Sequence, residues 1–193
     1  WCLNKLFLKM KQELEKNILE NKEALSHINL ESVEKIALKI DETRNSDRTV
    51  YVAGNGGSSS TASHFVNDLI KATINKDKNL IKAISLTDNV PLLTAVSNDI
   101  NYSDIFRFPL ESLSSEGDML IVISASGNSK NLINAVDYCN QNNIYTVGLL
   151  GFDGGTLNKK VNLSNLIQTE PNKYELVENM HMVICHLISS YLK

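Results

Sequence analysis

The stretch Thr49-Val-Tyr-Val-Ala53-Gly-Asn-Gly-Gly57-Ser-Ser-Ser-Thr-Ala-Ser-His64-Phe-Val-Asn-Asp68 indicates the fold class of this chain. Its apolar start predicts a buried strand. The glycines that follow allow a sharp turn and a close approach of the backbone to a ligand. The small polar residues from Ser58 onward predict a helix start, where free backbone N–H groups favour an anion. The stretch therefore predicts a strand, a turn and a helix that form a phosphate site.

Other interpretations of this stretch are weaker or simpler. No Gly-Lys-Ser/Thr follows the glycines, so it is not a Walker A loop, and the third spaced glycine of the dinucleotide fingerprint is missing. We therefore expect no nucleotide cofactor. The glycines can also form a mere tight connection between a strand and a helix. His64 and Asp68 lie four residues apart on one helix face, where they are either functional or a surface pair.

Composition excludes several classes of protein. The 193 residues predict one domain over 1–193, and 42% hydrophobic residues are enough for a core. A net charge of −3 argues against a nucleic-acid partner, and no apolar run approaches the ~20 residues of a membrane span. The three cysteines, an odd number without paired spacing, favour a reducing cytoplasm.

From residue 46 to 193, strand and helix patterns alternate. We expect strands at 49–53, 80–86, 118–124, 144–149 and 163–168, with helices near 58–72, 89–97, 129–141 and 172–192. This order predicts an α/β fold in three layers, a doubly wound and mostly parallel five-stranded sheet with a flavodoxin-like layout. Ligands of such sheets bind beyond the carboxyl ends of the strands.

Residues 1–45 carry two helical patterns that precede the first strand. Their apolar residues recur at mostly three- and four-residue steps, as at Leu3, Leu6, Phe7, Met10, Leu14, Ile18 and Leu25. Such an arm either covers its own sheet or packs on another subunit. Because the stripe is wide, we favour a subunit interface and hence a homo-oligomer.

A second motif repeats the design of the first. Asp118-Met-Leu-Ile-Val-Ile-Ser124 predicts a strand, and Ala-Ser126-Gly-Asn-Ser129 follows it with hydroxyl groups at a helix start. The hydroxyl groups of Ser124, Ser126 and Ser129 can surround one phosphate through neutral hydrogen bonds and a helix dipole. One serine cluster can be a simple helix cap, but two at strand ends of one domain indicate a phosphorylated ligand.

These motifs resemble those of the sugar isomerase (SIS) domain family, and within it the phosphoheptose isomerases. The resemblance rests on Gly54-Asn-Gly-Gly-Ser58 with His64-Phe65, on Ser97-Asn98-Asp99 and on Ser124-x-Ser126-Gly-Asn-Ser129, and it extends over nearly the whole chain. Some proteins of this family are non-catalytic binding or assembly proteins. The family also implies a homotetramer with sites shared between subunits.

The resemblance assigns roles to individual residues. It implies that Ser58, Ser124, Ser126 and Ser129 hold the phosphate, and that Asn55, Gly56, Gly57, Asn98 and Asp99 contact the sugar. Asp68 stands where the family has a catalytic glutamate, His186 matches its catalytic histidine, and His64 matches a position that binds zinc in some members. Ala125 replaces a usual threonine, and Glu178 replaces a usual glutamine at this substrate site.

The ionisable residues permit two kinds of chemistry. Aldose–ketose isomerisation needs a base and an acid, for which Asp68 and His186 are the candidates. Alternatively, His64, Asp68, Glu178 and His186 form a zinc set of two histidines and two carboxylates. The simpler alternative is that the carboxylates only bond to the histidines.

The leading hypothesis is a phosphosugar isomerase that converts sedoheptulose 7-phosphate to its aldose through an enediol, as a step toward a bacterial surface polysaccharide. The alternative is a catalytically silent SIS protein that binds a sugar phosphate or helps to assemble a complex. The replacements at Asp68 and Ala125 favour that alternative, whereas the presence of His64 and His186 favours the enzyme.

Overall fold

The structure, a computed structural model, describes residues 2–193, with side chains from residue 8 onward. Its centre is a five-stranded sheet in the order β2-β1-β3-β4-β5. The strands are β1 (Thr49–Gly54), β2 (Lys82–Ser85), β3 (Met119–Ser124), β4 (Tyr145–Gly151) and β5 (Leu163–Ile167). All four pairings are parallel, so the expected, mostly parallel sheet is entirely parallel.

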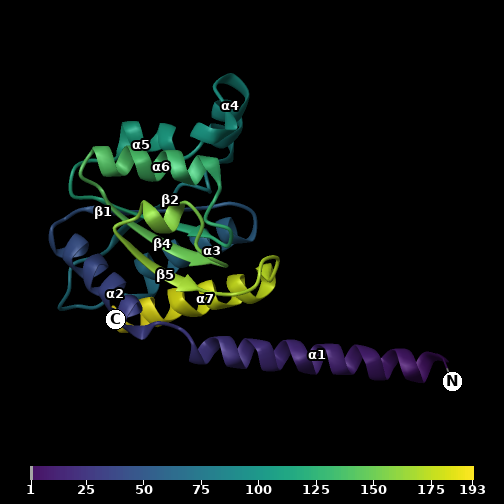
Figure 1. Cartoon of the computed structure of the whole chain (residues 1–193). Coiled ribbons are helices and arrows are strands. Elements are labelled where there is room, and N and C mark those ends of the chain that lie inside the picture. The colour runs from purple at the N-terminus through teal and green to yellow at the C-terminus, as the bar shows by residue number, and fades with distance from the viewer. Residues whose placement is uncertain (1) are drawn as a thin grey trace.

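The central strands are apolar because both faces of the sheet are covered. Along β1, Val50 and Val52 belong to one buried cluster, whereas Tyr51 and Ala53 belong to the other. Helices α2 (Leu30–Asn45), α3 (Gly57–Asn67) and α7 (Tyr174–Tyr191) cover the first face, and α5 (Arg107–Leu113) and α6 (Lys130–Gln141) cover the second (Figure 1). The expected three layers of a doubly wound fold are confirmed.

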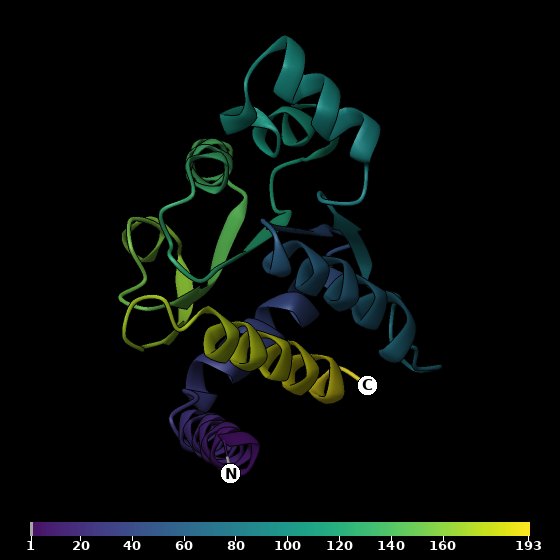
Figure 2. The same ribbon diagram turned by 90° about the vertical axis from the view of Figure 1, so that its right-hand side faces the viewer.

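The helix predicted over 58–72 consists of two parts. α3 ends at Asn67, and a π-helical turn, η1 (Asp68–Ala72), continues it. α7 lies beside α3 on the same face (Figure 2). The helix predicted over 89–97 is α4 (Val90–Asp99), which precedes the short turn η2 (Tyr102–Asp104). A further short turn, η3 (Leu157–Lys159), precedes β5.

Helix α1 (Cys2–Ser26) extends away from the rest of the molecule and contacts it mainly through α7 (Figure 1). Its apolar side chains from residue 8 onward are largely exposed, including Leu8, Met10, Leu14, Ile18 and Leu25. Trp1 lies outside the described residues, and Leu3, Leu6 and Phe7 lie outside the described side chains. Within residues 2–193, no helix combines the length and the apolar character that crossing a lipid bilayer needs.

Candidate active site

The first part of the site is the turn between β1 and α3. Gly56 has a φ of 54°, a conformation that favours glycine, and α3 begins at the next residue. A Cβ atom at Gly54 would lie 2.5 Å from the carbonyl oxygen of Ser58, so the turn also needs glycine there. The first N–H groups of a helix have no partner within the helix. The turn therefore brings these donors and Ser58 to the end of β1.

The second part is the loop from Ser124 to Ser129, at the end of β3. Gly54 and Ile123 are register partners, so the two strand ends are adjacent. The hydroxyl of Ser124 accepts a hydrogen bond from the Gly127 N–H at 3.0 Å. Ser129 is the N-cap residue of α6, and its side chain makes no capping bond. Its hydroxyl is therefore free to bind a ligand.

A cavity of about 240 Å³ joins the two parts. Four serines line it, together with Glu178 from α7 and Asn55 from the β1 turn; the serines are Ser58, Ser124, Ser126 and Ser129. Among the residues whose side chains the structure describes, no lysine, arginine or histidine lines it. The structure thus brings the serines predicted to hold phosphate into one hydroxyl-rich cavity.

The loop that carries these serines is braced by the segment after β4. Gly127 has a φ of 62°, and a Cβ atom there would lie 2.0 Å from the carbonyl oxygen of Gly154. The side-chain oxygen of Asn128 accepts hydrogen bonds from the N–H and the hydroxyl of Thr156, both at 2.9 Å. The loop is therefore fixed against the segment that follows β4.

Asn55 is held by a residue that the sequence patterns missed. The amides of Asn55 and Asn131 exchange two hydrogen bonds, at 3.0 and 2.9 Å, and the Tyr102 hydroxyl donates to Asn55 at 3.1 Å. Asn131 is almost fully buried, and no motif marked it. Asn55 and Tyr102 also line a second cavity of about 250 Å³, with Gly56, Ser59, Thr87 and Ser97.

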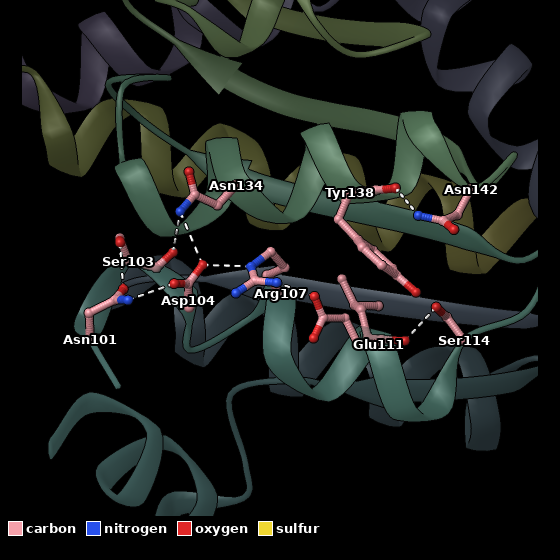
Figure 3. A network of polar contacts seen from close by, with 10 residues as sticks. Asn101, Ser103, Asp104, Arg107, Glu111, Ser114, Asn134, Tyr138 and Asn142 are labelled. Atoms are coloured by element: carbon pink, nitrogen blue, oxygen red, sulfur yellow. Dashed lines mark hydrogen bonds and ion pairs between the residues drawn. The ribbon is translucent and has the colours of Figure 1, made fainter. Parts of the chain in front are cut away.

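A buried carboxylate fixes the segment that carries Tyr102 (Figure 3). Asp104 accepts hydrogen bonds from Arg107 at 2.6 Å, Asn101 at 2.6 Å and Asn134 of α6 at 3.2 Å. These donors, Arg107 first, lower the pKa of Asp104 to about 2. The network ties η2 to α5 and α6 and so holds Tyr102 beside Asn55.

The third part of the site is a cluster of ionisable groups farther along α3 and α7. The Nε2 atoms of His64 and His186 are 3.2 Å apart. An Asp68 carboxylate oxygen lies 3.5 Å from His64 Nε2 and 3.6 Å from His186 Nε2. Asp68 opens the π-helical turn, a form of helix that occurs often at functional sites.

The spacing of this cluster suits a zinc ion. Zinc bonds of roughly 2.0–2.2 Å in a tetrahedral arrangement place ligand atoms roughly 3.3–3.6 Å apart. The three measured separations, 3.2, 3.5 and 3.6 Å, are close to these values. Two histidines and a carboxylate also supply the nitrogen and oxygen ligands that catalytic zinc sites use. The residues therefore fit the metal.

The chain matches the family described as SIS domain over residues 14–151, which is most of its length. It belongs to the SIS domain family. It is 33% identical over 185 residues to the phosphoheptose isomerase of Aliarcobacter butzleri, covering 93% of this chain and 95% of that protein. It is 32% identical to the phosphoheptose isomerase of Sulfurimonas denitrificans, covering 96% of this chain and 91% of that protein.

A solved structure gives the same result for the fold. The phosphoheptose isomerase of Francisella tularensis superimposes on this SIS domain with a TM-score of 0.84 and 26% sequence identity, covering 95% of this chain and 96% of the other. The strand order and the helical layers described above are thus those of a phosphoheptose isomerase structure.

The structure divides the predicted zinc set of this SIS domain. His64, Asp68 and His186 have ligand atoms within 4.8 Å of one another, and Glu178 is not in this group. The Glu178 carboxylate instead lies against Gly57, where an added Cβ atom would be 2.5 Å from its Oε1. Glu178 is two turns before His186 on α7 and belongs to the serine cavity.

Two other predicted contacts lie elsewhere. Asn98 and Asp99, at the end of α4, are exposed and bond to each other at 2.7 Å. They line neither the serine cavity nor the cavity beside Tyr102, although their neighbour Ser97 lines the latter. The structure of one chain thus does not bring them to the serines.

Two further features lie outside the site. His181 is fully buried, and burial lowers its pKa to about 4, so it is neutral at physiological pH. A cavity of about 740 Å³ lies between the end of α1 and the start of α7. It contains none of the predicted site residues, and the chemistry above therefore belongs to the smaller cavities.

Proposed function

We propose that this SIS domain protein is an aldose–ketose isomerase that interconverts sedoheptulose 7-phosphate and the corresponding heptose 7-phosphate. Its curated relatives named above are phosphoheptose isomerases. The observation that carries the proposal is the separation of two chemically different regions on the paired helices α3 and α7. One is rich in hydroxyl groups, and the other holds the ionisable groups.

The separation of these regions suits a seven-carbon substrate. Glu178 marks the serine cavity on α7, and His186 marks the ionisable cluster eight residues later, about 12 Å along the helix axis. This length is comparable to that of an extended seven-carbon chain with a terminal phosphate. A phosphate in the serine cavity would therefore place the carbonyl end of the sugar near His64, Asp68 and His186.

In this proposal the serines and the helix N-termini bind phosphate, and the cluster moves protons. Asp68 takes a proton from C1 of the ketose, and His186 gives a proton to the carbonyl oxygen at C2, which produces an enediol. Return of a proton to C2 and loss of the proton from the C1 hydroxyl complete the aldose. The proximity of the two groups supports this division of work.

We propose a second use of the same residues, as the alternative to direct proton transfer by Asp68 and His186. In it, His64, Asp68 and His186 hold zinc, which when bound supplies a Lewis acid for the substrate oxygens. The separations of their ligand atoms support this assignment. Zinc content can be measured by mass spectrometry on the purified protein without an activity assay. His64→Ala should lower it, whereas His27→Ala, in the exposed turn after α1, should not.

The assembly that we propose is a homotetramer formed through α1, in the cytoplasm. The exposed apolar residues of α1 support association between copies of the chain. Two buried free thiols, Cys139 and Cys185, are consistent with a reducing compartment.

A series of ketose phosphates tests the proposed substrate. Kinetics should give the highest kcat/KM for sedoheptulose 7-phosphate. Fructose 6-phosphate is one carbon shorter, and a displacement of roughly 1 Å can cost about a hundredfold in rate. Equal values for six- and seven-carbon sugars would reject the length argument. Binding without turnover of any sugar would instead favour a silent phosphosugar-binding protein.

A further inference from the structure

Glu178 is an unexpected residue for a cavity that binds phosphate. It is half-buried and shares the 240 Å³ cavity with Ser58, Ser124, Ser126 and Ser129. Its carboxylate oxygens lie against Gly57, the first residue of α3. A helix N-terminus attracts anions, so this carboxylate lies where the phosphate of a substrate would be most stable.

Among the described residues, no cationic side chain lines the cavity beside Glu178. From α3 it faces Gly57 and Ser58, from the β1 turn Asn55, and from the β3–α6 loop the three serines. In the part of the chain that the structure describes, Tyr174, one turn earlier on α7, is the only other titratable residue that lines the cavity. Lys130 and Lys173 lie outside its lining, and Lys173 pairs with Glu20 at 2.7 Å.

We propose that Glu178 determines the anion specificity of this cavity and couples phosphosugar binding to the uptake of a proton. This inference rests on the proposed function. A carboxylate and a phosphate in one small cavity repel each other unless one of them is protonated. The proton comes from solvent and resides on Glu178 or on the phosphate, whose second pKa is about 6. Affinity for the phosphosugar therefore falls as the pH rises, and Glu178 lowers the affinity for dianions.

Calorimetry with sedoheptulose 7-phosphate and with inorganic phosphate tests the inference. The wild-type protein should bind both ligands more weakly at pH 8 than at pH 5.5. The apparent enthalpy at pH 7 should change with the ionisation enthalpy of the buffer, which measures the proton taken up. Glu178→Gln should bind the phosphosugar at least about tenfold more tightly than wild type at pH 8, which corresponds to about 1.4 kcal/mol. Its affinity for the phosphosugar should no longer fall between pH 5.5 and pH 8.

The matched control is Glu175→Gln, the same change at an exposed position three residues earlier on α7. It should leave the pH dependence unchanged. Wild-type affinity that does not vary between pH 5.5 and 8 would overturn the inference without reference to any variant. Weaker binding by Glu178→Gln at every pH would also overturn it, because the carboxylate would then be an acceptor for sugar hydroxyl groups.

The failure of the proposed function gives a different result. If neither the wild-type protein nor Glu178→Gln binds either ligand at any pH, the serine cavity is not a phosphate site. The proposed function and this inference would then fall together. If both proteins bind the phosphosugar equally at all pH values, the phosphate site stands and only the inference is wrong.

Discussion

At the scale of single residues, Asp68 has two candidate roles that differ in the reach they need. Its carboxylate oxygen is 3.5 and 3.6 Å from the Nε2 atoms of two histidines. A metal ligand must keep this position, whereas a base must reach the substrate beyond it. The Asp68 oxygen already completes a triangle with the two Nε2 atoms. We therefore expect that the aspartate side chain has the length that a shared metal site with the two histidines needs.

Substitutions at Asp68 separate the two roles. Asp68→Glu should lower both zinc content and turnover, because the added methylene displaces the carboxylate from the two histidines. Asp77→Glu, the same change at an exposed residue, should alter neither. Higher activity in Asp68→Glu would show instead that Asp68 is a base placed too far back.

Removing the ionisable groups altogether should affect turnover rather than binding. Asp68→Asn and His186→Gln should each reduce kcat by about 10²–10⁴-fold, the usual contribution of general acid–base catalysis. Phosphosugar affinity should stay within a few-fold, because the serines hold the phosphate. Unchanged kcat in Asp68→Asn would remove both roles and favour a silent binding protein.

A substitution at Ser126 tests phosphate binding rather than turnover. Ser126→Ala should weaken binding of sedoheptulose 7-phosphate by roughly 1.5–3 kcal/mol, the value of a hydrogen bond to a charged group. Phosphate-free sedoheptulose should bind poorly to both proteins. The control Ser115→Ala lies on an exposed loop before β3. An equal loss of affinity for both sugars would show that Ser126 is not at the phosphate.

At the scale of elements, the loop after β3 depends on a glycine for two separate reasons. Gly127 has a positive φ, and a Cβ atom there would lie 2.0 Å from the backbone of Gly154. Gly117 has a φ of 86°, but its nearest contact would be Arg48 at 3.4 Å. The two glycines share the conformational requirement and differ in the space around them.

Alanine substitutions at Gly117 and Gly127 distinguish backbone strain from a steric clash in a stability measurement. Gly117→Ala should lower the free energy of unfolding by about 1–2 kcal/mol, the cost of a left-handed conformation. Gly127→Ala should cost more than about 3 kcal/mol and also weaken phosphate binding, because the 154–155 backbone must move. Thermal and urea unfolding measure both values. Similar losses in the two variants would contradict the close packing of the two loops.

The elements differ in how well the sequence predicts them. The central strands are predictable because Ile121-Val-Ile123 and the run 145–150 are nearly continuous apolar stretches. Each of the five observed strands lies within two residues of its expected bounds. The sequence does not predict helix α5, because its seven residues are fewer than the roughly 11–18 over which a helical pattern is recognised. They also contain Pro109, which is tolerated in a first turn. The π-helical turn at Asp68 follows from packing, and its residues read as ordinary helix.

The residues of the site also divide into those that the sequence predicts and those that it does not. Serines at strand ends were predictable because parallel strands bring their carboxyl ends to one edge. Asn131 was not, since its role depends on meeting Asn55 from a position 76 residues away. Helical spacing placed Glu178 and His186 on one face, but eight residues of separation puts them in different regions of the site.

At the scale of the whole molecule, α1 predicts association. Its apolar side chains are exposed, with Leu14 at 54% and Ile18 at 67%. Exposed apolar stripes of this kind usually mark interfaces. We expect light scattering to give a tetramer, and Leu14→Glu to produce smaller species at micromolar concentration.

The control for that substitution is Gln12→Glu. It adds the same charge to α1 at a position about 200° around the helix from Leu14, and it should leave the tetramer intact. A wild-type protein that stays monomeric at micromolar concentration would contradict the predicted interface. If both variants dissociate, added charge rather than loss of the apolar contact would be the cause.

The proposed isomerisation can be observed directly by NMR in D₂O. The purified protein is incubated with sedoheptulose 7-phosphate, with and without added zinc. We predict aldose signals that appear with deuterium at C2, because an enediol takes its new proton from solvent or from a group that exchanges with it. Binding of the phosphosugar without any aldose under either condition would contradict the proposed isomerase function.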